Sequence, residues 1–126
     1  MSLIAHIAIV DDWESARNLG EYAVSTRGVS LNDAGFVHAV TLSGVGDVLE
    51  HRYAHARFDL LLIILDTDAL LAEGLGVTEN TPGQPQVDGP IQTDGAAVVE
   101  VLLIERSANG FIAPDRRHLD TRSHLD

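Results

Sequence analysis

Residues 60–65, with the sequence LLLIIL, constrain the fold of this chain more than any other stretch. Six apolar residues in a row leave a strand without a polar face, so both of its faces must be covered. We therefore expect a central strand here, with other elements packed on either side. The chain has 126 residues and is 45% hydrophobic, which suits one domain with one core.

Other apolar stretches predict further strands, and polar residues and glycines mark the helices between them. The expected strands are residues 3–10, 21–25, 36–40, 60–65, 75–79 and 96–106, with a last apolar piece at 111–113 after an Asn109–Gly110 turn. The expected helices are residues 13–19, capped by Asp11 or Asp12 and ended by Gly20; a turn at 31–34 between Ser30 and Gly35; residues 44–57 after Ser43; and a short capped turn at 66–74. The inner stripe of helix 44–57 is expected to comprise Val45, Val48, Leu49, Arg52 and Ala56. The proline-containing stretch 80–89 is expected to be an exposed loop.

Short helices interspersed with strands favour an α+β fold with a mixed or antiparallel sheet over a regular doubly wound sheet. Residues 1–114 are expected to form this single domain. Residues 115–126 contain two similar polar pieces, RRHLD and RSHLD, six residues apart. We expect this tail to be disordered or to form an oligomer contact.

The composition excludes several kinds of chemistry. There are no cysteines, so disulfides, thiol nucleophiles, thiolate zinc sites and iron–sulfur clusters are ruled out. All eight basic residues are arginines, and without lysine neither a Schiff base nor a P-loop lysine is available.

The charge and the length of the apolar runs narrow the range of partners. The net charge of −11 opposes the binding of nucleic acid, whereas a few arginines can still form a local pocket for a small ligand. No apolar run approaches the ~20 residues of a membrane span, and the N-terminus lacks the basic region of a signal peptide. We expect a cytoplasmic protein with no membrane segment.

Two histidines lie inside apolar strand segments. His6 is part of LIAHIAIV, and His38 is part of FVHAV. Side chains alternate along a strand, so His6 shares a face with Ile4 and Ala8. Two interpretations stay open. Either both rings point into one cleft, where a neutral histidine could bond a ligand hydroxyl or transfer a proton, or each is a core residue bonded to a backbone carbonyl.

A second group of polar residues has the spacing of metal ligands on a helix. Asp47, His51 and His55 follow one another at intervals of one turn. They lie off the apolar stripe of that helix, so a solvated flank is favoured and no metal site is predicted. The acidic piece at 66–68 could bind a cation, but a helix cap by Thr67 or Asp68 explains it more simply.

Four further residues are candidates for binding or catalysis. Glu79 and Asp88 flank the proline-containing stretch, and either could act as a general base. Arg27 could clamp a phosphate or a carboxylate, and Tyr22 could offer a ligand a stacking platform. Each also has a simpler interpretation as surface charge or packing.

The order of these pieces resembles the bacterial family catalogued as Domain of Unknown Function 952. The matching pieces are LIAHIA, DDWESARNLGEY, VSLNDAGFVHAV, DLLLIILDTDAL, VTE and VDGPI…AAVVEV, which together cover about residues 3–112. Positions of the family pattern are occupied here by His6, Tyr22, Ser30, His38 and Glu79. In the family segment F-P-H-x-Y-G-P, this chain has Gln86 in place of the histidine and Asp88 in place of the tyrosine.

The resemblance implies a small α+β fold similar to that of ADP-ribosyltransferases and RNA 2′-phosphotransferases, in which NAD-like ligands lie in a central cleft. It also implies that His6 holds a ribose hydroxyl. The first hypothesis is therefore a small-molecule enzyme or binding domain for NAD or another ADP-ribose-like nucleotide. In this scheme Tyr22 stacks on the ligand, His38 is the acid or base, and Glu79 or Asp88 stabilises positive charge. The remaining binding residues would be Arg27 and Ser30.

Two other hypotheses stay open. A cofactor-free enzyme acting on an apolar metabolite would suit a pocket in which Val40 and Gln86 replace polar family residues. A non-catalytic, homo-oligomeric interaction domain would instead form a homodimer through an edge strand or the repeated tail. Phosphate transfer to RNA is ranked last because of the negative charge.

Overall fold

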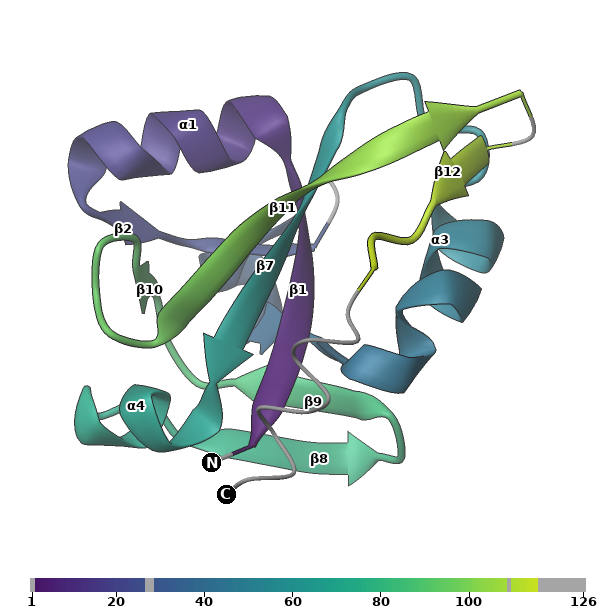
Figure 1. The fold of residues 1–126 in the computed structure, drawn as a ribbon. Coiled ribbons are helices and arrows are strands. Elements are labelled where there is room, and N and C mark those ends of the chain that lie inside the picture. Colours follow the sequence, from purple (N-terminus) through teal and green to yellow (C-terminus); the bar gives the residue numbers. More distant parts are fainter. Residues whose placement is uncertain (1, 27–28, 109, 116–126) are drawn as a thin grey trace.

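The main structural unit is a five-stranded sheet with the strand order β12-β11-β7-β1-β6 (Figure 1). The structure is a computed structural model that describes residues 2–26, 29–108 and 110–115. The strands of this sheet are β1 (Leu3–Ile9), β6 (Val40–Thr41), β7 (Leu60–Asp66), β11 (Val98–Ser107) and β12 (Gly110–Ile112). Their ladders are antiparallel, and the helices are short, which confirms the predicted α+β class.

Strand β7 occupies the centre of the sheet, as its sequence predicts. It pairs with β1 on one side and with β11 on the other, and five of its seven residues are buried. Alternate residues of β1 and β7 enter two separate core clusters, because successive side chains of a strand point to opposite faces.

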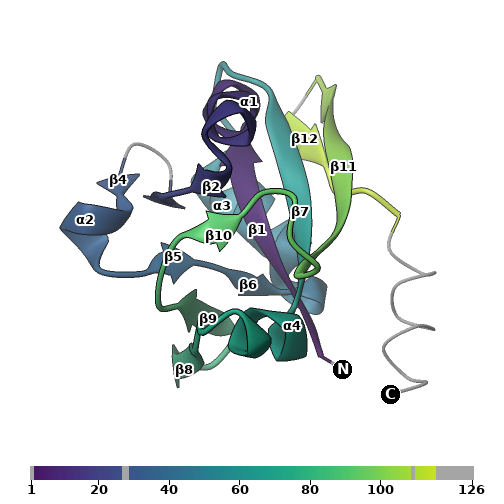
Figure 2. The ribbon, with the colours of Figure 1, turned by 90° about the vertical axis from the view of Figure 1, so that its left-hand side faces the viewer.

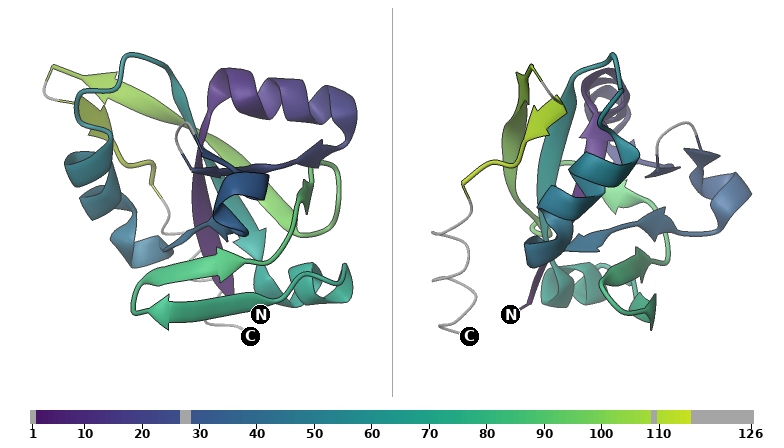
Figure 3. Two further views of the ribbon diagram at one scale, coloured as in Figure 1. Left: turned by 180° about the vertical axis from the view of Figure 1, so that it is seen from behind. Right: turned by 90° about the vertical axis from the view of Figure 1, so that its right-hand side faces the viewer.

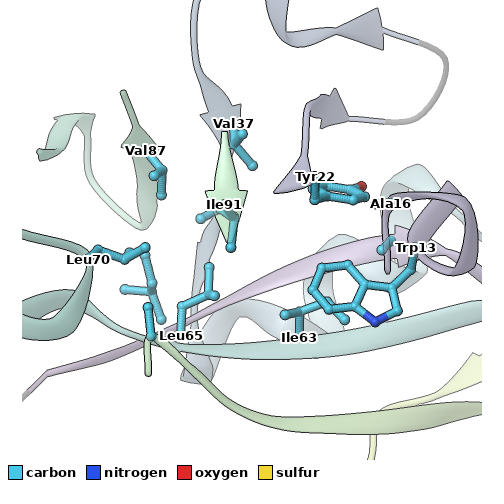
Figure 4. Close-up of a cluster of buried hydrophobic side chains, with 13 residues drawn as sticks. Trp13, Ala16, Tyr22, Val37, Ile63, Leu65, Leu70, Val87 and Ile91 are labelled. Carbon is cyan, nitrogen blue, oxygen red and sulfur yellow. The ribbon is translucent and has the colours of Figure 1, made fainter. Parts of the chain in front are cut away.

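The two faces of the sheet are covered by different helices. Helix α3 (Val45–Arg52) packs on one face through Val45 and Leu49. Helix α1 (Val10–Leu19) packs on the other face through Trp13 and Ala16, beside Tyr22, as Figure 4 shows. The two helices lie far apart along the sheet in Figure 1.

The helix limits correct several predictions. Helix α1 begins at Val10, directly after Ile9, so Asp11 and Asp12 are not caps but first-turn residues, where their negative charges favour the helix dipole. Ser43 is not a cap either, because it lies in the 3₁₀ turn Leu42–Gly44 that precedes α3. Helix α3 ends at Arg52 and not at residue 57, because the next residue, Tyr53, leaves the helical conformation and is buried in the core.

The two shorter helices are closer to expectation. Helix α2 (Leu31–Ala34) has Ser30 as its cap and Gly35 in the left-handed conformation that ends it, as predicted. Helix α4 (Thr67–Ala72) is capped by Asp66, whose carboxylate accepts from two backbone N–H groups. The predicted cap by Thr67 or Asp68 is therefore wrong by one or two residues.

Three small sheets complete the fold. They pair β10 (Ile91–Gln92) with β2 (Glu21–Tyr22), β3 (Val24–Thr26) with β4 (Val29–Ser30), and β5 (Val37–His38) with β9 (Gln84–Val87) and β8 (Val77–Thr81). The predicted loop at 80–89 is wrong, because β8 and β9 form a hairpin there. Pro85 has no N–H to donate within this strand, but its carbonyl oxygen still accepts from Ala39 N–H.

The chain changes sheets at Ala39, inside the predicted strand 36–40. Val40 and Thr41 pair with β1 in the main sheet, whereas Val37 and His38 pair with β9. Figure 2 shows β5 and β6 as one line that runs from the outlying α2 to the main sheet, above the β8–β9 hairpin. This strand switch places residues of both sheets beside one another.

Some expectations fall on residues that are not described. Asn109 of the expected Asn109–Gly110 turn and residues 116–126 of the expected tail 115–126 lie outside the described part. In the described ranges, no helix is long and apolar enough to cross a membrane.

Candidate functional site

His6 is sealed in the interior of the protein. It projects from the middle of β1, on the face covered by α1, and is 2% exposed. Its Nδ1 lies 2.6 Å from the backbone carbonyl oxygen of His38, and its Nε2 lies 2.7 Å from the Tyr22 hydroxyl. A carbonyl oxygen can only accept, so Nδ1 carries the proton and donates it. In the neutral ring Nε2 is therefore the acceptor, and the Tyr22 hydroxyl donates to it.

The surroundings of His6 keep its ring neutral. Burial lowers the pKa of His6 from 6.5 to about 4; the bond to the His38 carbonyl opposes this change, and the nearby His38 ring adds to it. Burial also raises the pKa of Tyr22, and the charges of Asp12 and Tyr53 add to that rise. Both groups are thus uncharged near neutral pH, and their hydrogen bonds persist in one arrangement.

Tyr22 is part of the core and offers no stacking platform on the surface. It is 1% exposed, its ring lies 5.1 Å from that of His6 and 5.2 Å from that of Trp13, and the three rings form one packed group. The predicted role of Tyr22 in stacking on a ligand is therefore wrong for this structure. Its hydroxyl instead donates to Nε2 of His6, whose tautomer is set by the His38 carbonyl.

His38 is only half-buried and forms a pair with an arginine. Its Nε2 lies 3.0 Å from Nη1 of Arg52, on α3. A guanidinium can only donate, so Nε2 accepts and the imidazole is neutral. Burial and then the positive charge of Arg52 lower the pKa of His38. The ring also faces that of Phe36, at 6.0 Å between centroids.

A pocket opens beside this pair, between β1, the strand switch, α3 and the tip of β9. Figure 3 shows these elements from behind. The pocket has an empty volume of about 370 Å³, which includes the part open to solvent, and only a small fraction of this volume is enclosed. Its lining consists of His6, Ile7, His38, Ala39, Val40, Val48, Arg52, Tyr53 and Gln84.

Of the predicted site residues within the described ranges, His6 and His38 line the pocket, and Tyr22 contacts His6 from the core. Glu79 is exposed on the β8–β9 hairpin, where its carboxylate accepts from Gly83 N–H at 2.6 Å. Asp88 is exposed beyond β9, and Ser30 caps α2. None of these three lines the pocket, so the predicted roles of Glu79 and Asp88 at a shared centre with His38 are not supported by their positions. Arg27 lies outside the described residues.

The pattern of metal-ligand spacing has a structural explanation. His51 is exposed, and its Nδ1 bonds the backbone oxygen of Asp47 at 2.8 Å. Among residues 2–26, 29–108 and 110–115, no group of three or more histidine, aspartate or glutamate side chains is arranged to hold a metal ion.

Sequence reasoning missed three polar members of the pocket: Arg52, Tyr53 and Gln84. A signal for Arg52 was present, because an arginine on the inner stripe of an amphipathic helix must direct its charged end to an opening in the core. Gln84 could not be found, because its segment was interpreted as a loop.

The sequence of this chain matches the model of one known protein family over most of its length. The model of the family described as "Protein of unknown function (DUF952)" matches residues 7–101, which include His38 and Arg52 and begin one residue after His6. The chain belongs to the DUF952 family. No curated protein matches it.

Solved structures support the same fold. Protein CC0527 from Caulobacter crescentus has a crystal structure that is similar with a TM-score of 0.67 and 21% sequence identity, covering 94% of this chain and 99% of that one. A double methionine variant of the same protein is similar with a TM-score of 0.67 and 20% identity over the same shares. At this identity the likeness concerns the fold alone.

Proposed function

We propose that the pocket beside His38 binds a small, partly apolar molecule that carries an anionic group, and that His38 exchanges a proton with it. The observation that supports this proposal is the pair formed by His38 and Arg52 at the pocket, with Nη1 and Nε2 3.0 Å apart. A guanidinium on an otherwise strongly acidic chain is the group that a carboxylate or phosphate would select.

Ligand binding would change the chemistry of His38. An anion that accepts a hydrogen bond from Arg52 would compete with His38 for the guanidinium. Nε2 of His38 would then be able to accept a proton. A negative charge beside the imidazole favours its protonated form, opposite to the effect of Arg52. Binding would therefore raise the pKa of His38 and take up a proton, and affinity would increase as the pH falls toward that pKa.

The size of the pocket sets the part of a ligand that fits. The enclosed part of the pocket has room for only one or two water-sized groups. One or two oxygens of a carboxylate or a phosphate, or the edge of a ribose, would enter it while the rest of the ligand lies at the opening, and a whole dinucleotide would not fit. If the fold belongs with that of the ADP-ribosyltransferases, as the resemblance implies, NAD would enter with one end group only. The burial of His6 and Tyr22 argues against direct contact of either with that group.

A ligand titration followed by NMR tests the proposal. The probes are inorganic phosphate, AMP, ADP-ribose and NAD, added to the ¹⁵N-labelled chain. We expect shifts of resonances from the pocket lining, and an increase in the dissociation constant of about tenfold or more in Arg52→Ala. Arg17→Ala is the matched control, because Arg17 is an exposed helix arginine paired with Glu14 elsewhere. Unshifted pocket resonances at millimolar concentrations of all four probes would refute the proposal.

A second candidate function follows from the rest of the lining. Ile7, Ala39, Val40 and Val48 give most of the pocket wall an apolar character. This favours a cofactor-free enzyme or binder for an apolar metabolite, in which shape contributes more than charge. Binding of uncharged benzamide with the same affinity in the unmodified chain and in Arg52→Ala would support this candidate over the first. The expectation of a homo-oligomeric interaction domain stays a prediction, which a measurement of mass in solution would test.

A further inference from the structure

The backbone pairing between β1 and the edge strand β6 stops at Val40, two residues before His38. The register pairs Ile4 with Thr41 and Ala5 with Val40, and continued pairing would place Ile7 opposite His38. Even residues of β1 direct their backbone groups toward β7, as the bonds from Val10 N–H to Asp59 O and from Thr67 N–H to Ser2 O show. The odd residues of β1 therefore direct their backbone groups toward β6. Yet the ladder between the described parts of these strands ends at Ala5.

The His38 carbonyl is turned toward β1 by the other sheet. Ala39 N–H bonds Pro85 O, and Val37 pairs with Val87, so the odd residues of this segment direct their backbone groups to β9. The groups of His38 point the opposite way. Where a regular ladder would supply the N–H of Ile7, the His38 carbonyl receives Nδ1–H of His6, at 2.6 Å.

This side-chain bond fixes the orientation of the His38 peptide. On one side the peptide is held by the β9 ladder, and on the other side by the imidazole of His6, which is 2% exposed. The His38 carbonyl requires the proton on Nδ1, and the Tyr22 hydroxyl donates to Nε2 of the same ring. The side chain of His38 extends from this fixed peptide, and its ring contacts Arg52.

We propose that His6 is a positioning residue for His38, which acts by donating from Nδ1 to the His38 carbonyl and so holds the His38 ring in its place at the pocket. The inference deepens the proposed function and rests on it only for its effect on ligand affinity. Its structural part, the orientation of the His38 ring toward Arg52, is independent of any ligand. Trp13 and Tyr22 support His6 and do not line the pocket.

Two isosteric variants separate the bond from the bulk of the ring. Asparagine places an N–H₂ near the position of Nδ1, whereas glutamine places its own near Nε2. In His6→Asn we expect the ¹⁵N resonances and the pKa of His38 to stay near those of the unmodified chain, and phosphate affinity to change by less than about threefold. In His6→Gln we expect displaced His38 resonances and about tenfold weaker phosphate binding, with the far-UV spectrum preserved.

Each outcome decides the matter. Equal behaviour of the two variants, whether both resemble the unmodified chain or both lose the His38 signature, would overturn the inference, because the position of the donor would then be irrelevant. If neither variant folds, the unmodified chain decides instead: the ring ¹⁵N shifts of His6 are expected to show the tautomer protonated on Nδ1. The tautomer protonated on Nε2 would overturn the inference, because Nδ1 could then not donate to the His38 carbonyl. Failure of phosphate to bind the unmodified chain would refute the proposed function, while the His38 resonances would still test the positioning role.

Discussion

The two strand histidines belong to one hydrogen-bonded group, yet they occupy opposite environments. His6 is 2% exposed and has both ring nitrogens bonded within the protein. His38 is half-buried, lines a pocket, and uses Nε2 for an exposed arginine. One ring is enclosed and held, and the other lies where a ligand could reach it.

A buried histidine such as His6 can therefore contribute to a binding site without contacting the ligand. The buried ring contributes a fixed donor to the backbone, and the half-buried ring contributes chemistry. Sequence patterns alone treat the two residues as equals.

The replacement of each histidine by leucine contrasts the two regions most directly. His6→Leu leaves the His38 carbonyl and the Tyr22 hydroxyl without their partner in the interior, so we expect a loss of about 2–4 kcal/mol in the free energy of unfolding. His38→Leu, at a half-buried position, is expected to cost less than about 1 kcal/mol. Urea denaturation monitored by Trp13 fluorescence measures both values. Similar losses in the two variants would contradict the division of roles.

The dependence of stability on pH tests the burial of His6. The unfolded chain binds a proton on this residue below its ordinary pKa of 6.5, whereas the folded chain does so only near 4. The free energy of unfolding is therefore unaffected above pH 6.5 and falls between pH 6.5 and about 4, by about 3 kcal/mol from His6. His6→Leu is expected to remove this part of the dependence, and His38→Leu to keep most of it. An unchanged pH profile in His6→Leu would show that His6 is not the group responsible.

Removal of the arginine tests the influence of Arg52 on the His38 ring. Burial and Arg52 together lower the pKa of His38, so Arg52→Ala should raise that pKa part of the way toward 6.5. An NMR titration of the His38 ring protons measures it, and Arg17→Ala is expected to leave it unchanged. The same titration should show no change for His6, whose low pKa has burial as its largest cause.

The smallest effects are expected at the acidic residues once assigned to the site. Glu79 accepts from Gly83 in the hairpin, so Glu79→Gln should cost at most about 1 kcal/mol in stability. Neither Glu79→Gln nor Asp88→Asn should alter phosphate affinity, because neither residue lines the pocket. A tenfold change in either variant would restore the acidic residues to the site.

The parts of the fold that the sequence predicts well are those with a strong local signal. The six apolar residues of β7 allow only a central position, and Ser30 with Gly35 defines α2 through its cap and its left-handed end. The β8–β9 hairpin was missed because Pro85 has no backbone N–H to donate to a ladder, and a proline therefore indicates a loop unless the pairing of its strand is known.

The site was predictable only in part. The sequence indicates that His6 and His38 are unusual, but alternation along a strand does not tell whether a ring ends in a cleft or against a carbonyl. That outcome depends on the strand switch at Ala39, a long-range pairing with β9 that no local pattern contains. The position of Arg52 similarly depends on how α3 packs over the edge of β1.

The strand switch also limits how the length of the chain can vary. A single residue, Ala39, separates pairing with β1 from pairing with β9. One added or deleted residue here would turn every following side chain of β6 to the opposite face, and Val40 would leave the core. Insertions at residues 38–40 should therefore prevent folding, whereas insertions at the tip of the β8–β9 hairpin, around residues 82–83, should be tolerated. A library of single-residue insertions and deletions would measure this contrast.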